Sequence, residues 1–453
     1  MKSYDVVIVG AATSGSFLAR RLAEAGRRVL VIDQKAEAGI GARYDIFHIV
    51  EQDFATFCLP MPCEGDDFAF RFSGGAAYSA LNRYPKESVG TTIGMHMHAY
   101  TLRLNRWAAE AGAELLYEAT FVDFLYTDGW ISGVVYEKDG KRQQAACRLV
   151  ADCSGIPSVA RRKLPDDYGV ENFEIGPTEM FYVTLRYAKY QNEGDYVKKG
   201  RSWPFYKTWE APEADPHGAI LGVGANLSFD VGEQVFQTFE KTVPLPAHTI
   251  DHIERGVTPY RRPPYSFVAD GFLAAGDAAC LTKPSAGEGV TSSMVQLEIA
   301  AAQLNLLLSE GRPLTRENLW PINKRYIEAQ GQAFASQLAT LAGAVATNEK
   351  ENDFFFEKDV IFSKKSFEAM GEGKALTFTA GELIGMAFKM LWGILAGRLR
   401  PSTLRALLDA MRNGGRIAAH YATYPDTPTG FETWCETAEA IWTDCGSMAD
   451  ALQ

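Results

Sequence analysis

The stretch "MKSYDVVIVGAATSGSFLARRLAEAGRRVLVIDQK", residues 1–35, decides the fold class. Its apolar, largely β-branched run at 6–9 predicts a strand of a parallel sheet, because such strands are buried on both faces. Residues 14–25 follow with leucines recurring on one helical face, and residues 29–32 form a second apolar run. This order of strand, helix and strand predicts a βαβ unit.

The turn "GAATSG" between the first strand and the helix suits a diphosphate. Gly10 permits the tight turn, Ala12 keeps the side chain small, and Gly15 lets the helix pack closely on the strand. Free N–H groups and the helix dipole attract an anion to the helix start. Asp33, at the end of the second strand, can accept hydrogen bonds from a ribose. We therefore expect an adenine dinucleotide here; the alternative is a purely structural turn.

Two later stretches also place an acidic residue and a small-residue turn after a strand. In "LVADCSGIPSVARRKL", residues 149–164, the turn contains Ser154 and Gly155. Residues 270–308 contain "GDAACLTKPSAGEGV", in which Asp277 follows a strand and a "GEG" turn precedes a long helix. An ordinary turn at a strand end is the alternative interpretation of the first stretch.

The sequence "GDAACLTKPSAGEGV" resembles the second FAD motif of the geranylgeranyl reductase family, among the flavoproteins that include para-hydroxybenzoate hydroxylase and the flavin-dependent halogenases. The resemblance lies in blocks within residues 1–165 and 270–330. It implies FAD as the cofactor. It also implies an α/β fold, in which a Rossmann-like FAD-binding domain with a parallel sheet is interleaved with an α+β substrate domain covered by a mixed sheet.

Carried over by position, the resemblance places Asp277 on the ribityl or diphosphate part of FAD. It also places a helix start at Gly289 and Val290 near the flavin pyrimidine, where a helix N-terminus stabilises the negative charge of reduced flavin. The residues expected to contact FAD are Gly10, Ala12, Ser14, Gly15, Asp33, Gln34, Arg43, Val122, Ser154, Gly155, Gly276, Asp277, Pro284, Gly287, Gly289 and Val290.

The stretch "DQKAEAGIGARYDIFH" departs from the family pattern. Arg43 aligns with the family arginine, but Tyr44 stands where relatives have a cysteine. Tyr44 and His48 are the candidate proton donors. His96 and His98 stand where relatives carry an arginine, and they could face a flavin or bind a metal. We expect no metal site, because no acidic or cysteine partner has ligand spacing.

The two domains are expected to alternate along the chain. The alternating pattern of "EMFYVTLRYAKY" predicts strands in the substrate domain. "GVGAN" lacks a third glycine and a following helix, so it does not indicate a second dinucleotide site. The expected segments are 1–44, 96–165 and 265–335 for the FAD-binding domain, 45–95 and 166–264 for the substrate domain, and 336–453 for a helical C-terminal region.

Within that region, "TAGELIGMAFKMLWGILAGRLRP" predicts a helix that is apolar almost all round. It begins with a capping box from Thr379 to Glu382 and is expected to stop before Pro401. Burial is the favoured interpretation of such a helix. Covering an apolar tunnel or lying on a membrane surface are the alternatives.

Composition and charge exclude several classes of protein. The net charge of −11 and the lack of a basic stripe argue against a nucleic-acid partner. Seven scattered cysteines without a CxxC pair indicate neither a disulfide framework nor a zinc site and fit the reducing cytoplasm. Asp5 interrupts the apolar run that a signal peptide needs. No apolar stretch is long enough to predict a spanning helix, so we expect a cytoplasmic protein, with membrane association left open.

These expectations favour an FAD-dependent oxidoreductase that reduces a carbon–carbon double bond of a hydrophobic, isoprenoid-like or lipid substrate. The electron donor would be NAD(P)H or a ferredoxin-like carrier. The alternative enzyme is an NAD(P)H-dependent aromatic monooxygenase with the same fold. A halogenase is disfavoured because no WxWxIP stretch is present, and a flavin-binding sensor is the non-enzymatic alternative.

Overall fold

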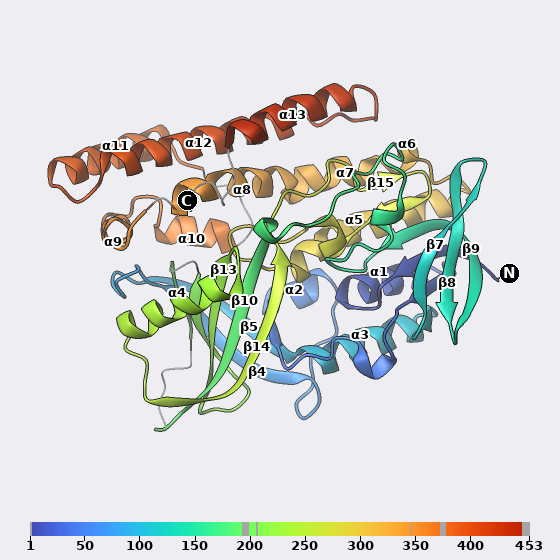
Figure 1. Ribbon diagram of the computed structural model, residues 1–453, viewed down its shortest axis with the longest axis horizontal. Helices are drawn as coiled ribbons and strands as arrows, with labels where there is room; N and C mark the ends of the chain where they lie inside the picture. Colours follow the sequence, from blue (N-terminus) through green and yellow to red (C-terminus); the bar gives the residue numbers. More distant parts are fainter. Residues whose placement is uncertain (1, 193–198, 205–206, 346, 372–376, 446–453) are drawn as a thin grey trace.

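The protein is built from two β-sheets and a layer of C-terminal helices (Figure 1). The computed structural model describes residues 2–192, 199–204, 207–345, 347–371 and 377–445. The helices α11, α12 and α13 form a band along one side of the molecule, and α5, α7 and α8 lie between this band and the sheets.

The first sheet has the strand order β15-β16-β9-β1-β2-β6, and β8 and β7 extend it from β9. Its neighbours along β16, β9, β1, β2 and β6 are parallel. The strands are β1 Lys2–Val9, β2 Val29–Ile32, β6 Glu114–Leu116, β7 Thr120–Thr127, β8 Trp130–Lys138, β9 Lys141–Asp152, β15 Val268–Ala269 and β16 Phe272–Ala274.

The predicted βαβ unit is present as β1, α1 (Thr13–Ala23) and β2. The side chains of residues 6–9 and 29–32 are all buried, which is why both runs are continuously apolar rather than alternating. Val9 is in register with Ile32 of β2 and Asp152 of β9. The carboxyl ends of the three strands therefore meet at one edge of the sheet.

The second sheet has the order β14-β10-β13-β12-β11-β4-β5-β3 and is mostly antiparallel. The predicted strand "EMFYVTLRYAKY" is β10, and "GVGAN" ends β13, so it is not a phosphate-binding turn. The strands are β3 Ile46–Val50, β4 Phe68–Ala77, β5 Lys86–His96, β10 Met180–Tyr190, β11 Gly200–Trp203, β12 Thr208–Pro212, β13 Gly218–Asn226 and β14 His248–Pro259.

The two sheets take their strands from alternating parts of the chain. The first draws on residues 2–32, 114–152 and 268–274, and the second on 46–96 and 180–259. The bounds of the six segments given above remain a prediction.

The remaining helices cover the sheets and form the C-terminal region (Figure 1). Residues Ile417, Tyr421, Tyr424 and Trp434 belong to the same hydrophobic core as the first sheet. The helices are α2 Glu51–Thr56, α3 Met97–Glu110, α4 Phe229–Thr242, α5 Val290–Ser309, α6 Arg316–Leu319, α7 Pro321–Tyr326, α8 Gln332–Val345, α9 Glu349–Lys358, α10 Lys364–Gly371, α11 Ala380–Leu395, α12 Pro401–Tyr421 and α13 Phe431–Cys445.

The apolar helix predicted from "TAGELIGMAFKMLWGILAGRLRP" is α11, and its capping box is formed by Thr379 and Glu382. The expected burial is wrong for one face, because Phe388 is 69% exposed and Leu395 79% exposed. Pro401 does not directly stop this helix; it occupies the first turn of α12, where its missing N–H costs nothing. In the described ranges, no helix is both long and apolar enough to cross a membrane.

Candidate flavin site

The turn after β1 is built around glycines that side chains would block. Gly10 has a φ of +106°, and a Cβ atom there would lie 2.4 Å from the carbonyl oxygen of Cys153. A Cβ atom on Gly15 would lie 1.9 Å from the carbonyl oxygen of Gly10. Both positions therefore require glycine. Ala12 is the N-cap of α1 and supplies no side-chain acceptor, so the first N–H groups of the helix have no partner within it.

Asp33 lies directly after β2 and ties neighbouring turns together. Its carboxylate accepts hydrogen bonds from the backbone N–H groups of Ala11 at 2.8 Å and Lys35 at 2.9 Å. The Asp33 carbonyl oxygen accepts a hydrogen bond from the Ala119 N–H at 2.8 Å, shortly before β7. Val122 follows in β7 at a register shift, and Gln34 is exposed. One carboxylate thus links the turn after β1 to the end of β2.

The turn after β9 is held by a buried acid. Asp152 is fully buried and accepts hydrogen bonds from the backbone and hydroxyl of Ser154, and from the N–H groups of Ala160 and Arg161. Burial raises the pKa of Asp152, although these donors oppose the rise. Gly155 follows with a φ of +77°. Asp152 therefore fixes the shape of the turn that carries Ser154 and Gly155.

The turn after β16 meets the first turn of α1. Gly276 has a φ of +63°, and a Cβ atom there would lie 2.6 Å from the Ser14 hydroxyl oxygen. Asp277 follows, and a Cβ atom on Gly289 would lie 3.2 Å from its Oδ1 atom. Burial raises the pKa of Asp277 to about 6. Within the described ranges, no hydrogen-bond donor reaches this carboxylate.

The start of α5 resembles the start of α1, because neither helix has a side-chain cap. The N-cap of α5 is Gly289, which has no side-chain acceptor for the first N–H groups of the helix. Gly287 precedes it with a φ of +70°. The carbonyl oxygen of Pro284 accepts a hydrogen bond from the Tyr260 hydroxyl, which anchors the loop before the helix.

These residues fit FAD. Two glycine-dependent turns and two uncapped helix starts offer N–H donors for anionic groups. The Asp277 carboxylate can accept a hydrogen bond from the cofactor, because no donor in the described ranges reaches it. The three turns lie at the carboxyl ends of the parallel strands, where open α/β sheets bind ligands.

A charged cluster lies on β3, the loop after β11 and the loop before α5. Lys283 Nζ is 3.2 Å from Glu288 Oε2, and the Lys283 N–H donates to the Glu288 carbonyl oxygen at 2.9 Å. Lys207 Nζ would lie 3.4 Å from a Cβ atom on Gly287. His48 interacts electrostatically with both Glu288 and Lys207.

The members of this cluster shift one another's pKa values. Burial lowers the pKa of His48 and of Lys207, and in both cases the charge of Glu288 opposes the fall. Burial would raise the pKa of Glu288, but Lys283, Lys207 and His48 outweigh it and lower the pKa. His48 and Glu288 are nevertheless exposed and Lys207 is half-buried, so solvent reaches this cluster in the flavin-free protein.

Comparison with known proteins indicates the same cofactor. Residues 5–216 match the family described as FAD dependent oxidoreductase. The chain is an FAD-dependent oxidoreductase. The oxidoreductase is 22% identical to a digeranylgeranylglycerophospholipid reductase of Sulfolobus acidocaldarius over 97% of this chain and 98% of that protein. It is 27% identical to digeranylgeranylglycerophospholipid reductase 2 of Methanopyrus kandleri over 66% of this chain and 76% of that protein.

Solved structures share the fold of the oxidoreductase. A geranylgeranyl bacteriochlorophyll reductase-like protein from Thermoplasma acidophilum superposes with a TM-score of 0.65 at 16% identity, covering 90% of this chain and 100% of that chain. The myxobacterial chondrochloren halogenase CndH superposes with a TM-score of 0.63 at 16% identity, covering 94% of this chain and 98% of that chain. The predicted interleaved α/β architecture is confirmed.

The two predicted proton donors have different surroundings in the oxidoreductase. His48 lies on β3 beside the charged cluster, whereas Tyr44 precedes β3 and packs on Tyr187 and His252, with ring centroids 4.6 and 4.3 Å away. The Tyr44 side chain is 54% exposed. Arg43 is also near β14, where its Nε atom lies 3.2 Å from Glu254 Oε1.

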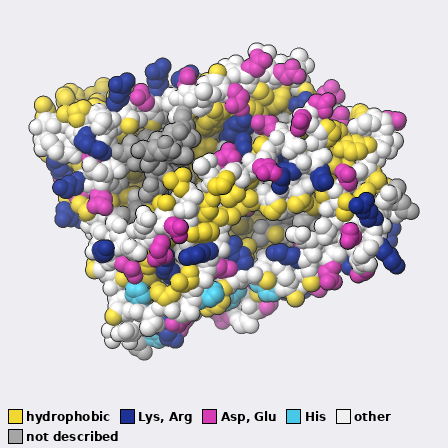
Figure 2. Space-filling view, viewed as in Figure 1, with side chains coloured by type: hydrophobic (Ala, Val, Ile, Leu, Met, Phe, Trp, Pro, Cys, Tyr) yellow, Lys and Arg dark blue, Asp and Glu magenta, His cyan; other side chains and the backbone are white. Residues whose placement is uncertain are grey.

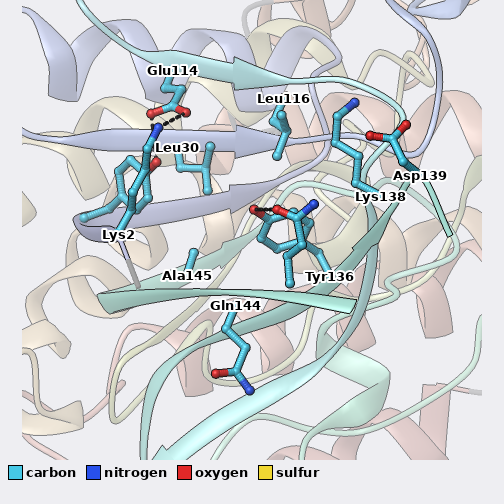
Figure 3. Close-up of a pocket in the computed structure, with 11 residues that line it drawn as sticks. Lys2, Leu30, Glu114, Leu116, Tyr136, Lys138, Asp139, Gln144 and Ala145 are labelled. Carbon is cyan, nitrogen blue, oxygen red and sulfur yellow. Dashed lines mark hydrogen bonds and ion pairs between the residues drawn. The ribbon is translucent and has the colours of Figure 1, made fainter. Parts of the chain in front are cut away.

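A separate cavity of about 380 Å³ lies at the opposite edge of the first sheet (Figure 3). Lys2 and Tyr4, at the start of β1, both interact with Glu114 of β6 in its wall. None of the residues expected to contact FAD lines this cavity. Because it lies at the amino ends of the parallel strands, it is not the flavin site of the oxidoreductase.

Three members of the charged cluster, Lys207, Lys283 and Glu288, were not predicted from the sequence. Glu288 stands inside the "GEG" turn, so its position beside the flavin motif was a usable signal. Lys207 has no such signal, because it is far from every motif along the chain. Within the described ranges, no group of three or more potential metal ligands occurs, and His98 Nδ1 interacts with the Ile40 carbonyl oxygen at 2.8 Å.

Proposed function

We propose that the protein reduces carbon–carbon double bonds of an isoprenoid lipid. The observation that carries this proposal is the similarity to a digeranylgeranylglycerophospholipid reductase along 97% of the chain. The site offers a flavin-binding cradle next to a group of proton carriers, which is what reduction of an alkene requires. FAD bound there and reduced by the electron donor would supply the hydride equivalent for one carbon of the double bond.

The residues proposed to hold FAD are those expected from the sequence. The turns with Gly10, Ala12, Ser14 and Gly15 would bind the diphosphate, and Asp33, Gln34 and Val122 the adenosine end. Ser154, Gly155, Gly276 and Asp277 would line the middle of the cofactor, and Pro284, Gly287, Gly289 and Val290 the flavin. Arg43 remains a proposed contact, although its guanidinium pairs with Glu254.

The second carbon of the double bond needs a proton, and we assign its supply to the charged cluster. His48 and Lys207 carry dissociable protons, and burial lowers the pKa values of both. Glu288 acts as a positioning residue, because its negative charge favours the protonated forms of both. Tyr44 remains a weaker candidate donor, because its ring packs on Tyr187 and His252 instead.

The electron donor is proposed to be NAD(P)H or a ferredoxin-like carrier that reaches the flavin transiently. The described ranges contain one sheet with a dinucleotide-type turn, and the glycines at 222–226 lie in β13. Hence a nicotinamide would have no second Rossmann unit in this part of the chain. We place the reaction in the cytoplasm, at the surface of the membrane that contains the lipid.

The first experiment follows the flavin spectrum after anaerobic reduction and rapid mixing with geranylgeranyl glycerolipids in detergent, or with air. Reoxidation by the lipid, with formation of the saturated product, is the expected result. If every isoprenoid is inert while air and an aromatic substrate reoxidise the flavin with hydroxylation, the protein is a monooxygenase and the proposal fails.

The proton supply is tested with Lys207→Met and Glu288→Gln. Lys207→Met is expected to slow lipid reduction by about 100-fold with unchanged flavin content, the usual loss for a general acid. Glu288→Gln lowers the pKa values of Lys207 and His48 further, so activity should be lost at a lower pH as the donor deprotonates. The control is Lys241→Met on the exposed side of α4, which should change neither rate nor pH profile. Unchanged profiles in both test variants would remove the cluster from the reaction.

A further inference from the structure

Helix α11 is attached to the protein by one face only. Met386, Met390 and Gly393 are its buried residues. A Cβ atom on Gly393 would lie 2.7 Å from the ring of Phe354 in α9, so the two helices are in close contact there. Lys389 Nζ donates a hydrogen bond to the Lys358 carbonyl oxygen at the end of α9. The inner face of α11 is therefore fixed.

The outer face of α11 is apolar and exposed. At 3.6 residues per turn its large side chains occupy about half of the helix circumference. The exposed fractions are 41% for Leu383, 59% for Ile384, 69% for Phe388, 53% for Leu391, 50% for Trp392 and 79% for Leu395. Continuous apolar surface of this kind on a monomer marks a site of contact with another protein or a membrane.

The charges around this face favour an anionic partner. The protein has a net charge of −11, yet residues 383–408 contain four basic residues and no Asp or Glu. The basic residues are Lys389, Arg398, Arg400 and Arg405. The Arg405 side chain is 88% exposed and lies 3.9 Å from the exposed Asp409, one turn further along α12. Arg398 and Arg400 pair with Glu357 and Glu351 of α9. In Figure 2, hydrophobic side chains gather at the end of the molecule where α11 lies, and Lys and Arg side chains border them.

We propose that the outer face of α11 docks the protein onto an anionic lipid bilayer, with the helix lying in the plane of the interface. Amphipathic helices with large apolar side chains, a tryptophan and neighbouring basic residues bind membranes in this way. The basic residues add attraction to anionic headgroups. A second copy of this chain would bring the same four basic residues against themselves, which disfavours self-association through this face. The docking proposal is argued from the contacts and exposed side chains of α11. The idea that docking brings the enzyme to its lipid substrate rests on the proposed function.

The test is co-sedimentation of the FAD-loaded protein with phosphatidylcholine vesicles that contain or lack phosphatidylglycerol. Binding to the anionic vesicles is expected, with weaker binding at high salt. The double variant Phe388→Ser/Leu395→Ser should lose at least about 10-fold in binding. Arg405→Glu should lose about 5- to 30-fold on anionic vesicles only. The matched control is Val89→Ser/Leu306→Ser, which removes two exposed apolar side chains from other surfaces.

Flavin content and the midpoint of thermal unfolding verify that each variant is folded. Equal sedimentation of the wild type and Phe388→Ser/Leu395→Ser would overturn the proposal. The proposal would also be overturned if the wild type did not bind vesicles but formed a dimer in analytical ultracentrifugation, and if Phe388→Ser/Leu395→Ser abolished that dimer. Vesicle binding without reduction of any isoprenoid would support the docking face and refute the lipid reductase. Reduction of lipid in detergent without vesicle binding would support the lipid reductase and refute the docking face.

Discussion

Asp277 carries an acidic group in a place where protein atoms exclude much of the water. Its pKa is raised from 3.8 to about 6 because burial penalises the charged form. In the flavin-free protein, ionisation therefore costs stability, since no described donor compensates the charge. Such a cost at a ligand site is common, because the group is arranged for the ligand rather than for the fold.

Asp277→Asn should stabilise the flavin-free protein in a pH-dependent way. The folded-state pKa is raised, so the wild type loses stability as the pH rises from about 4 to about 6, and the variant does not. At about pH 8 the variant should be more stable by about 1–3 kcal/mol, and the difference should vanish below about pH 4. Urea unfolding across this range measures it, with the exposed Asp128→Asn as the control. A difference that does not change with pH would contradict the assigned ionisation.

At the scale of elements, Glu351 joins α9 to the start of α12. Its carboxylate accepts hydrogen bonds from the backbone and side chain of Arg400, the Thr403 hydroxyl and the Asn348 N–H. Its side chain is 2% exposed. Burial alone would raise the pKa of Glu351, but these donors hold it down at about 2. The inner face of α11 packs on the same helix, so this acid supports the whole C-terminal corner.

Glu351→Gln should weaken this corner at neutral pH. Because the folded-state pKa is depressed from 4.5 to about 2, the contribution of the ionised carboxylate is present above pH 4.5 and is lost as the pH falls towards 2. A loss of about 2–3 kcal/mol is expected at neutral pH, shrinking below about pH 4. The control Glu368→Gln removes an exposed partner of Lys364 and should cost less than about 0.5 kcal/mol. Equal losses in the two variants would show that burial of Glu351 contributes nothing.

For the molecule as a whole, the C-terminal helices complete the core of the first sheet. Trp434 of α13 is 6% exposed and contacts the rings of Tyr265, Tyr421 and Tyr424, with centroids 4.9 to 5.5 Å apart. The Tyr424 hydroxyl donates to the Tyr265 carbonyl oxygen at 2.7 Å, close to the start of β15. The FAD-binding sheet and the C-terminal helices are therefore expected to unfold together.

Trp434→Ala should destabilise this shared core by about 3–5 kcal/mol, the usual cost of removing a buried aromatic side chain. Circular dichroism and flavin fluorescence should report one thermal transition in both wild type and variant. Trp130→Ala, whose side chain is 42% exposed, should cost less than about 1 kcal/mol. The contrary result is a variant that loses part of its helix signal at a lower temperature than the wild type while releasing flavin at the same temperature. That result would show that the C-terminal region is a separate unit.

Local sequence was sufficient for the features that depend on neighbouring residues. The β-branched run before Gly10, the spacing to Gly15 and the acid at Asp33 predict a βαβ unit, because strand burial, turn geometry and helix start are properties of a short segment. The capping box at Thr379 is local for the same reason. The resemblance of the "GDAA" and "GEG" stretches to a family FAD motif predicted the cofactor.

Only the tertiary structure decided what depends on distant segments. It brought Lys207 beside Glu288 and His48, and it separated Tyr44 from them, because the second sheet is assembled from residues 46 to 259 in an order that no local pattern encodes. It also left half of α11 uncovered. An apolar helix has the same sequence whether its neighbours cover it or not, so exposure follows from the packing of the whole chain.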